Sequence, residues 1–171
     1  MANKMKTHVK WSPMDFPDRI KNHPEKLKEA RLGMMTKAKD MVAQRAVSNI
    51  DSMGSNYTRE AVRSISGEQG SNSLTEATDK HAIVGSHSIS AIILEHGRSP
   101  GRRAPVSAIA PWAATKGITN RRAIYLISQA IAIRGIRPRR PIYRALKAAE
   151  NKFTGIAMDA ADKFLNALGF H

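Results

Sequence analysis

Two long helical patterns, one near each end of the chain, constrain the fold most. Apolar residues recur at helical spacing over residues 24 to about 53 and again over about 140 to 168, with charged residues on the other sides. Pro24 suits the first position of a helix, where a missing backbone N–H costs little. Most of the stability of such a helix comes from packing of its apolar stripe. The sequence therefore predicts two long helices packed with the elements between them.

The segments after the first helix have strand and turn patterns. Residues 57–66 end in the alternation V-R-S-I-S, which predicts a strand, and GEQGSNS at residues 67–73 predicts a turn or hairpin loop. Residues 74–85 predict a second strand that ends at Ala82, Ile83 and Val84. The apolar run at residues 89–94 has the length of a strand or of a short helix. We expect an α+β fold, a single domain in which a small antiparallel or mixed sheet packs with long helices.

Helix signals return in the second half of the chain. A helix is predicted from near Ser107 to Lys116, with Pro111 inside its first turn and Gly117 at its end. Asn120 is a candidate cap for the next helix, at residues 121–134, and Gly135 ends that helix. This second helix has almost no polar face. It must therefore be buried on nearly all sides, in part by another subunit.

Residues 1–23 predict an extended N-terminal arm. Prolines at positions 13 and 17 preclude a continuous helix, and Trp11, Phe16 and Ile20 are isolated apolar anchors. The arm either lies on its own domain or reaches a neighbouring subunit, and the sequence leaves both open.

The chain is strongly basic, with 28 Lys and Arg against 14 Asp and Glu and a formal net charge of +14. Such a surface attracts phosphate polymers or an acidic protein. Lysines of the N-terminal third are equally well explained as a solvated helix face. Arginines near Gly and Pro favour contact with carboxylates or phosphates, because guanidinium is a planar fork. These are Arg98, Arg102, Arg103, Arg121, Arg122, Arg134, Arg137, Arg139, Arg140 and Arg144.

The sequence contains no catalytic or metal-binding pattern. His81, His87 and His96 lack the spacing of zinc ligands, and no carboxylate cluster accompanies them. Glycine motifs that bind phosphates or dinucleotides are absent. No apolar run approaches the roughly 20 residues that cross a bilayer, and the N-terminus lacks the apolar region of a secretory signal. We expect a protein that is not an enzyme, needs no cofactor or metal, is used without export and contacts no membrane.

Residues 83–118 are the most informative about function. An apolar run leads into a Glu and a Gly, then a basic loop with Pro, then a helix that carries a Trp and ends in Lys-Gly-Ile. The positions are Leu94, Glu95, Gly97, Arg98, Pro105, Trp112, Lys116, Gly117 and Ile118. This order resembles the middle of the head-to-tail joining and tail-completion (neck) proteins of long-tailed phages. Similar segments at IRPRRPIYRAL (136–146) and TREAVRSIS (58–66) extend the resemblance over about residues 24–150.

The resemblance implies a structural virion protein of the neck, whose ring joins the tail to the DNA-filled head, with six copies favoured over twelve. Its partners would be a head connector or adaptor and a tail tube or terminator protein, with non-specific contact to genomic DNA in the lumen. It would be assembled in the host cytoplasm and reside in the virion. The chain would divide into the arm, a tail-completion-like domain at 24–150 and a C-terminal helix extension at 151–171.

The same resemblance selects candidate residues. Those expected at an assembly interface are Glu95, Arg98, Arg102, Arg103, Arg137, Arg139 and Arg140, and those expected to be structural are Gly97, Trp112, Gly117 and Pro141. Glu95 would pair with an arginine of the same or an adjacent subunit, and the alternative is an ordinary exposed acid at a strand end. Trp112 is expected to be a core anchor rather than a platform for stacking bases.

A second candidate function is a non-enzymatic nucleic-acid-binding protein. The net charge and the arginine-rich loops favour it. An aromatic content of only 5% and the absence of a known reading motif count against it.

Overall fold

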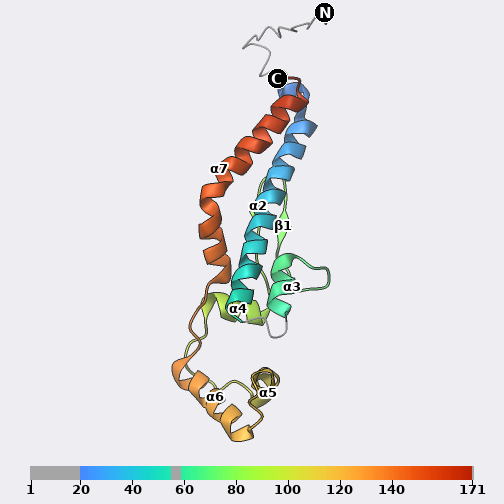
Figure 1. Ribbon diagram of the computed structural model, residues 1–171. Helices are drawn as coiled ribbons and strands as arrows, with labels where there is room; N and C mark the ends of the chain where they lie inside the picture. Colours follow the sequence, from blue (N-terminus) through green and yellow to red (C-terminus); the bar gives the residue numbers. More distant parts are fainter. Residues whose placement is uncertain (1–19, 55–58, 171) are drawn as a thin grey trace, which may run out of the picture.

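The computed structural model describes residues 20–54 and 59–170. Two long antiparallel helices form its framework (Figure 1). They are α2 (Pro24–Ser52) and α7 (Pro141–Ala167). Lys26 Nζ donates to the Ala167 carbonyl at 2.9 Å, and Asn49 Nδ2 donates to the Pro141 carbonyl at 3.0 Å. Each end of one helix is therefore tied to the opposite end of the other, and both predicted long helices are confirmed.

The core lies where the C-terminal half of α2 meets the first half of α7 and two short helices. Those are α3 (Glu60–Ser66) and α4 (Ile89–His96). Small side chains such as Ala46, Ala145 and Ala149 let the helices approach closely, while Ile50 and Ile65 fill the space between them and are fully buried. This packing holds α2, α3, α4 and α7 together as one body.

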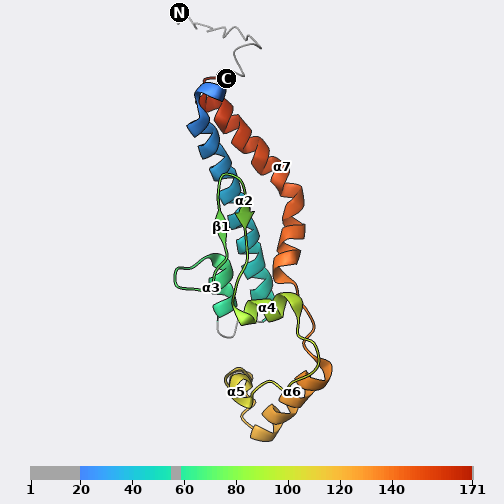
Figure 2. The same cartoon turned by 180° about the vertical axis from the view of Figure 1, so that it is seen from behind.

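A small antiparallel sheet completes the body. Strand β1 (Glu76–Ala77) pairs with β2 (Ala82–Ile83), with Glu76 opposite Ile83 and Ala77 opposite Ala82. An isolated bridge between Ser73 and Ser86 continues the ladder. The hairpin packs along α2 (Figure 2). The fold is thus α+β, with a small antiparallel sheet packed against long helices, as the sequence predicts.

The strand predicted at residues 57–66 is wrong, because in its described part Arg59 precedes helix α3 and Glu60–Ser66 form that helix. The V-R-S-I-S alternation has a period of two, but the buried residues are Ala61, Ser64 and Ile65, which lie on one helical face. Ser64 Oγ bonds to the Ala61 carbonyl at 3.0 Å, so its hydroxyl is satisfied inside the helix. The run at residues 89–94, left open between strand and helix, belongs to α4.

Helices α5 (Val106–Thr115) and α6 (Arg121–Arg134) form a hairpin that stands apart from the body. They contact each other and no other helix or strand of the described chain (Figure 1). Residues 101–134, which we call the projecting unit, have a small separate core made by Ile109, Ala113 and Ile124. Both helices lie close to their predicted bounds, although Pro111 falls in the second turn of α5 rather than the first.

The expectation that α6 is buried on nearly all sides is wrong for the single chain. Only Ile124 and Ser128 are buried in it, whereas Leu126 is 54% and Ile133 is 73% exposed. The body does not reach α6, so nothing within the described chain covers this apolar surface.

The predicted cap of α6 gives a first testable expectation. Asn120 Oδ1 accepts a hydrogen bond from the Arg122 backbone N–H at 2.8 Å. Because the projecting unit has so small a core, Asn120→Ala should cost about 1 kcal/mol and show as faster amide hydrogen exchange throughout α6. Thr119→Ala, next to it and also exposed, is the matched control and should leave exchange unchanged. Equal exchange in both variants would contradict the role of the cap.

Two expectations concern the ends of the chain. Residues 1–19 of the expected arm lie outside the described residues, and residues 20–22 are helical. Residue 150 lies inside α7, so the expected C-terminal extension is the second half of one continuous helix up to Ala167. Within the described ranges, no helix has the length and apolar content needed to cross a membrane.

Candidate assembly interface

Two matching segments join the projecting unit to the body, and we call them the neck. They are G-R-S-P at residues 97–100 and G-I-R-P at residues 135–138. Arg98 and Ile136 form an antiparallel bridge, in which each backbone N–H donates to the other carbonyl at 2.8 Å. Each segment follows a helix directly, since Gly97 caps α4 and Gly135 caps α6. The segment that leaves the body and the segment that returns to it therefore lie side by side.

The two neck glycines interlock across this bridge. Gly97 has φ +76° and Gly135 has φ +70°, a region that favours glycine. A Cβ on Gly97 would collide with the Ile136 carbonyl, and a Cβ on Gly135 would collide with the Arg98 carbonyl. Each glycine therefore admits the backbone of the opposite segment. This reciprocal contact fixes the chain path at the neck and gives the predicted structural residue Gly97 a physical role.

Glu95 caps the start of α7 from the end of α4. Its Oε2 accepts from Ile142 N at 2.9 Å and its Oε1 from Tyr143 N at 3.0 Å. A carboxylate in this place satisfies two unpaired helix amides and complements the positive end of the helix dipole. Within the chain, the carboxylate of Glu95 is bound by these two backbone amides and not by the arginine that the sequence suggested. Neighbouring Pro141 is buried at the first position of α7, as a structural residue should be.

The body end of the neck is tied further by backbone and arginine contacts. The Leu94 carbonyl accepts from Arg139 N at 2.8 Å and from Arg140 N at 3.1 Å. Arg139 Nη1 donates to the Met53 carbonyl at 2.9 Å, at the end of α2. Arg139 therefore joins the end of α2 to the start of α7, a structural role that sequence reasoning missed.

The remaining candidate arginines divide into two groups. Arg98 Nη2 donates to the Arg102 carbonyl at 2.6 Å, Arg103 lies over the Tyr125 ring and donates to its hydroxyl at 2.6 Å, and Arg140 lies over the Tyr143 ring. The side chains of Arg102 and Arg137 are exposed and have no partner among the residues the structure describes. These two are the candidates best placed to meet another molecule.

The prediction of a structural role holds for one of the two candidates at α5 and differs from the structure for the other. Gly117 follows α5 with φ +73°, where Gly117 N donates to the Ala114 carbonyl and Ile118 N to the Ala113 carbonyl. This pair of bonds ends the helix as predicted. Trp112 is 37% exposed, so the core position expected for it is wrong. Ile109, one turn before it, and Ala113, the next residue, occupy the core instead.

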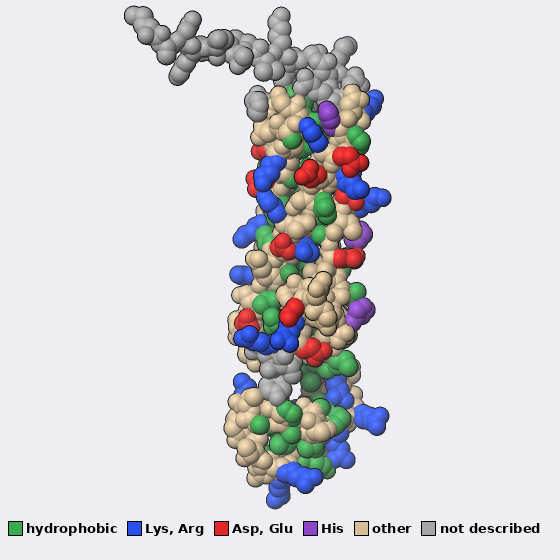
Figure 3. Space-filling view, turned by 90° about the vertical axis from the view of Figure 1, so that its right-hand side faces the viewer, with side chains coloured by type: hydrophobic (Ala, Val, Ile, Leu, Met, Phe, Trp, Pro, Cys, Tyr) green, Lys and Arg blue, Asp and Glu red, His purple; other side chains and the backbone are tan. Residues whose placement is uncertain are grey.

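The charge of the chain is concentrated around this region. Residues 96–149 contain twelve Lys and Arg and no Asp or Glu, so all 14 acidic residues lie elsewhere. On the face drawn in Figure 3, the projecting unit carries hydrophobic and basic side chains, and the acidic side chains lie on the body. The projecting unit therefore presents positive charge together with uncovered apolar surface, a combination suited to an acidic partner.

No group of His, Asp and Glu within residues 20–54 and 59–170 could hold a metal ion. The chain matches no protein-family model, and neither curated proteins nor solved structures include a significant match to it.

Proposed function

We propose that this chain is a non-enzymatic structural protein of the virion neck, the joint between head and tail. It would be a ring-forming tail-completion or head-to-tail connector protein. The observation that carries the proposal is the projecting unit, a basic helix hairpin with an uncovered apolar helix face, held away from the body by the interlocked neck. Apolar side chains as exposed as Leu126 and Ile133 are typical of surfaces that meet another protein. The resemblance at residues 83–118 supports the virion neck, between head and tail, as the place of assembly.

The proposed assembly is a closed ring, with six copies favoured over twelve. A head connector or adaptor would lie on one side of it and a tail tube or terminator protein on the other. Exposed arginines such as Arg102 and Arg137 would meet acidic partner surfaces or tolerate genomic DNA in the lumen. The protein would be assembled in the host cytoplasm and remain in the virion.

The absence of acidic residues from 96–149 also favours the second candidate function, a non-enzymatic nucleic-acid-binding protein. The two candidates differ in how binding responds to salt and sequence. The virion protein should bind free DNA weakly and without sequence preference, with affinity that falls steeply as salt rises. Selective binding at about 10⁻⁸ M in about 0.15 M salt would favour the nucleic-acid-binding protein instead.

The direct test of the proposed function is the size of the assembled protein. Light scattering and electron microscopy of the full chain should show a closed ring, and the same ring should be found in particles at the head–tail joint. Because apolar burial contributes to the contact, the ring should persist at high salt. A protein that stays monomeric at high concentration, with no ring in the particle, would refute the proposal.

A further inference from the structure

The exposed side of α6 carries a continuous apolar ridge. Leu126, Ala130 and Ile133 lie four and then three residues apart, so they share one face of the helix, and all three are exposed. The opposite side, with Ile124, Ile127 and Ile131, packs in the small core of the projecting unit. We call Leu126, Ala130 and Ile133 the ridge.

Charge disfavours a contact between two such ridges. Arg122 lies one turn before Leu126 on the same face, Arg134 follows Ile133 directly, and the projecting unit has no acidic residue. Two ridges facing one another would bring arginines together in a surface that loses its water, which is costly. The surface that covers the ridge must therefore be apolar and must carry acidic groups at its edge.

The body of the same chain has such a surface. Two adjoining cavities, of about 330 and 280 Å³, share Val84 and Ile142 and lie between the β1–β2 hairpin, α2, α4 and the first half of α7. We call them together the body groove. Its edges expose large apolar side chains, namely Leu74, Ile83, Ile92 and Leu146. The groove is thus apolar and open to a neighbour.

Acidic residues border the body groove. Glu76 is the strand partner of Ile83, Glu150 lies one turn after Leu146 on α7, and Glu95 lines the second cavity. The one lysine that lines the groove, Lys39, is paired with Asp40 at 3.0 Å. Glu76 and Glu150 make exposed pairs with His81 and Lys147, and such pairs are weak enough to be exchanged.

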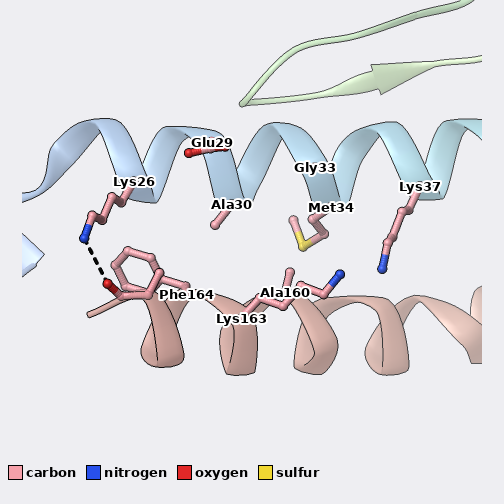
Figure 4. A pocket seen from close by; sticks show the side chains of 10 residues that line it. Lys26, Glu29, Ala30, Gly33, Met34, Lys37, Ala160, Lys163 and Phe164 are labelled. Atoms are coloured by element: carbon pink, nitrogen blue, oxygen red, sulfur yellow. Dashed lines mark hydrogen bonds between the residues drawn. The ribbon is translucent and has the colours of Figure 1, made fainter. Parts of the chain in front are cut away.

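The other hollows of the described chain fit the ridge less well. The hollow between the start of α2 and the end of α7 is lined by three lysines, Lys26, Lys37 and Lys163, against one acid, Glu29 (Figure 4), so its charge would repel a basic unit. A second is bordered by Arg45 and Lys152, and a third, beside α3, is polar. Among these hollows of the described residues, the body groove is the one that combines apolar walls with glutamates that are not outnumbered by lysines.

We propose that the ridge of one copy docks into the body groove of the next copy. The inference rests on the proposed ring and specifies which two surfaces build it. Ridge and groove are different surfaces of one chain, so the contact is head-to-tail, the kind that generates rings when the rotation closes. The interlocked neck glycines then set the angle between the two surfaces, and with it the rotation from one subunit to the next.

The chain lacks cysteine, which makes cross-linking a clean test. Two single variants, Ile133→Cys on the ridge and Ile83→Cys at the groove, are co-expressed with tags of different size and treated with a short bismaleimide. Cross-linked pairs should contain one chain of each kind. Cells expressing either variant alone should yield no pair. Met158→Cys, on an exposed part of α7 outside the groove, is the control and should link to neither.

The outcomes separate this inference from the proposed function. A ring of the expected size in which Ile133→Cys links to itself or to Met158→Cys would overturn the docking and leave the ring intact. Absence of any ring, in solution and in particles, would overturn both.

A second variant tests the docking without cysteine. Ile133 is 73% exposed, so Ile133→Asp should leave the melting temperature of the subunit unchanged and weaken association at least about tenfold. Met158→Asp is the matched control and should weaken nothing. Association that is unaffected by Ile133→Asp would refute the ridge as an interface.

Discussion

Replacing Gly135 with Ala is expected to open the neck. The backbone at position 135 has φ +70° and ψ −162°, a combination open essentially to glycine only, and the new Cβ would collide with the Arg98 carbonyl while lying 3.1 Å from Pro100 N. The conformation costs about 1 to 3 kcal/mol and the overlap about 1 to 3 kcal/mol more, so the closed neck should lose about 2 to 6 kcal/mol. Hydrogen exchange at the amides of Arg98 and Ile136, which form the bridge, should accelerate accordingly. Gly97→Ala should reproduce the effect, because the two glycines have reciprocal contacts.

Gly117→Ala is the matched control for both neck variants. Gly117 has a similar φ of +73°, but a Cβ there would have no heavy atom within 4 Å. Only the cost of the left-handed conformation remains, about 1 to 2 kcal/mol, and it should be confined to the end of α5. If all three variants behaved alike, the reciprocal packing of the neck would not matter for its stability.

Glu95→Ala is expected to destabilise the body itself. The variant loses two hydrogen bonds from a carboxylate to the first amides of α7, and the beginning of that helix is part of the core. The cost should be about 2 to 3 kcal/mol in the free energy of unfolding, measured by denaturant melting. Glu95→Gln keeps one oxygen acceptor without the charge, so its free energy of unfolding should lie between those of the wild type and Glu95→Ala.

This expectation differs from the one that the sequence alone suggests. If Glu95 paired with an arginine across an interface, its loss would harm assembly more than folding. Glu150→Ala removes an exposed carboxylate paired with Lys147 and should cost less than about 1 kcal/mol. Wild-type melting of Glu95→Ala, combined with loss of the ring, would restore the interface interpretation.

Local chemistry explains why the helix ends were predictable. Pro24 begins α2, Asn120 caps α6, and Gly117 and Gly135 end α5 and α6, each acting within a few residues of its own position. The failure at α3 has the opposite character. Its seven residues are too few for the helical period to outweigh a chance alternation, and only contacts with α2 and α4 decide which side is buried.

The candidate site was predicted as a region rather than as a set of contacts. The sequence marks Glu95, Gly97 and Pro141 as special, and the structure gathers all three where the neck meets the body. The partners of Glu95 and Gly97, however, are backbone atoms of segments about forty to fifty residues away, and nothing local indicates them. One signal was available in the repeated Gly-x-x-Pro of residues 97–100 and 135–138, which sequence analysis did not recognise as a pair.

The adjacent segments of the neck have a consequence for the history of the chain. The bridge between Arg98 and Ile136, and the bond from Gly101 N to the Ala132 carbonyl, bring entry and exit of the projecting unit together. A unit whose two ends meet can be added, lengthened or lost by a single insertion or deletion in the gene, with little disturbance of the parent fold. A chain can therefore keep the α2–α7 framework while its projecting unit changes, and in the proposed ring that unit is the part that meets the next copy.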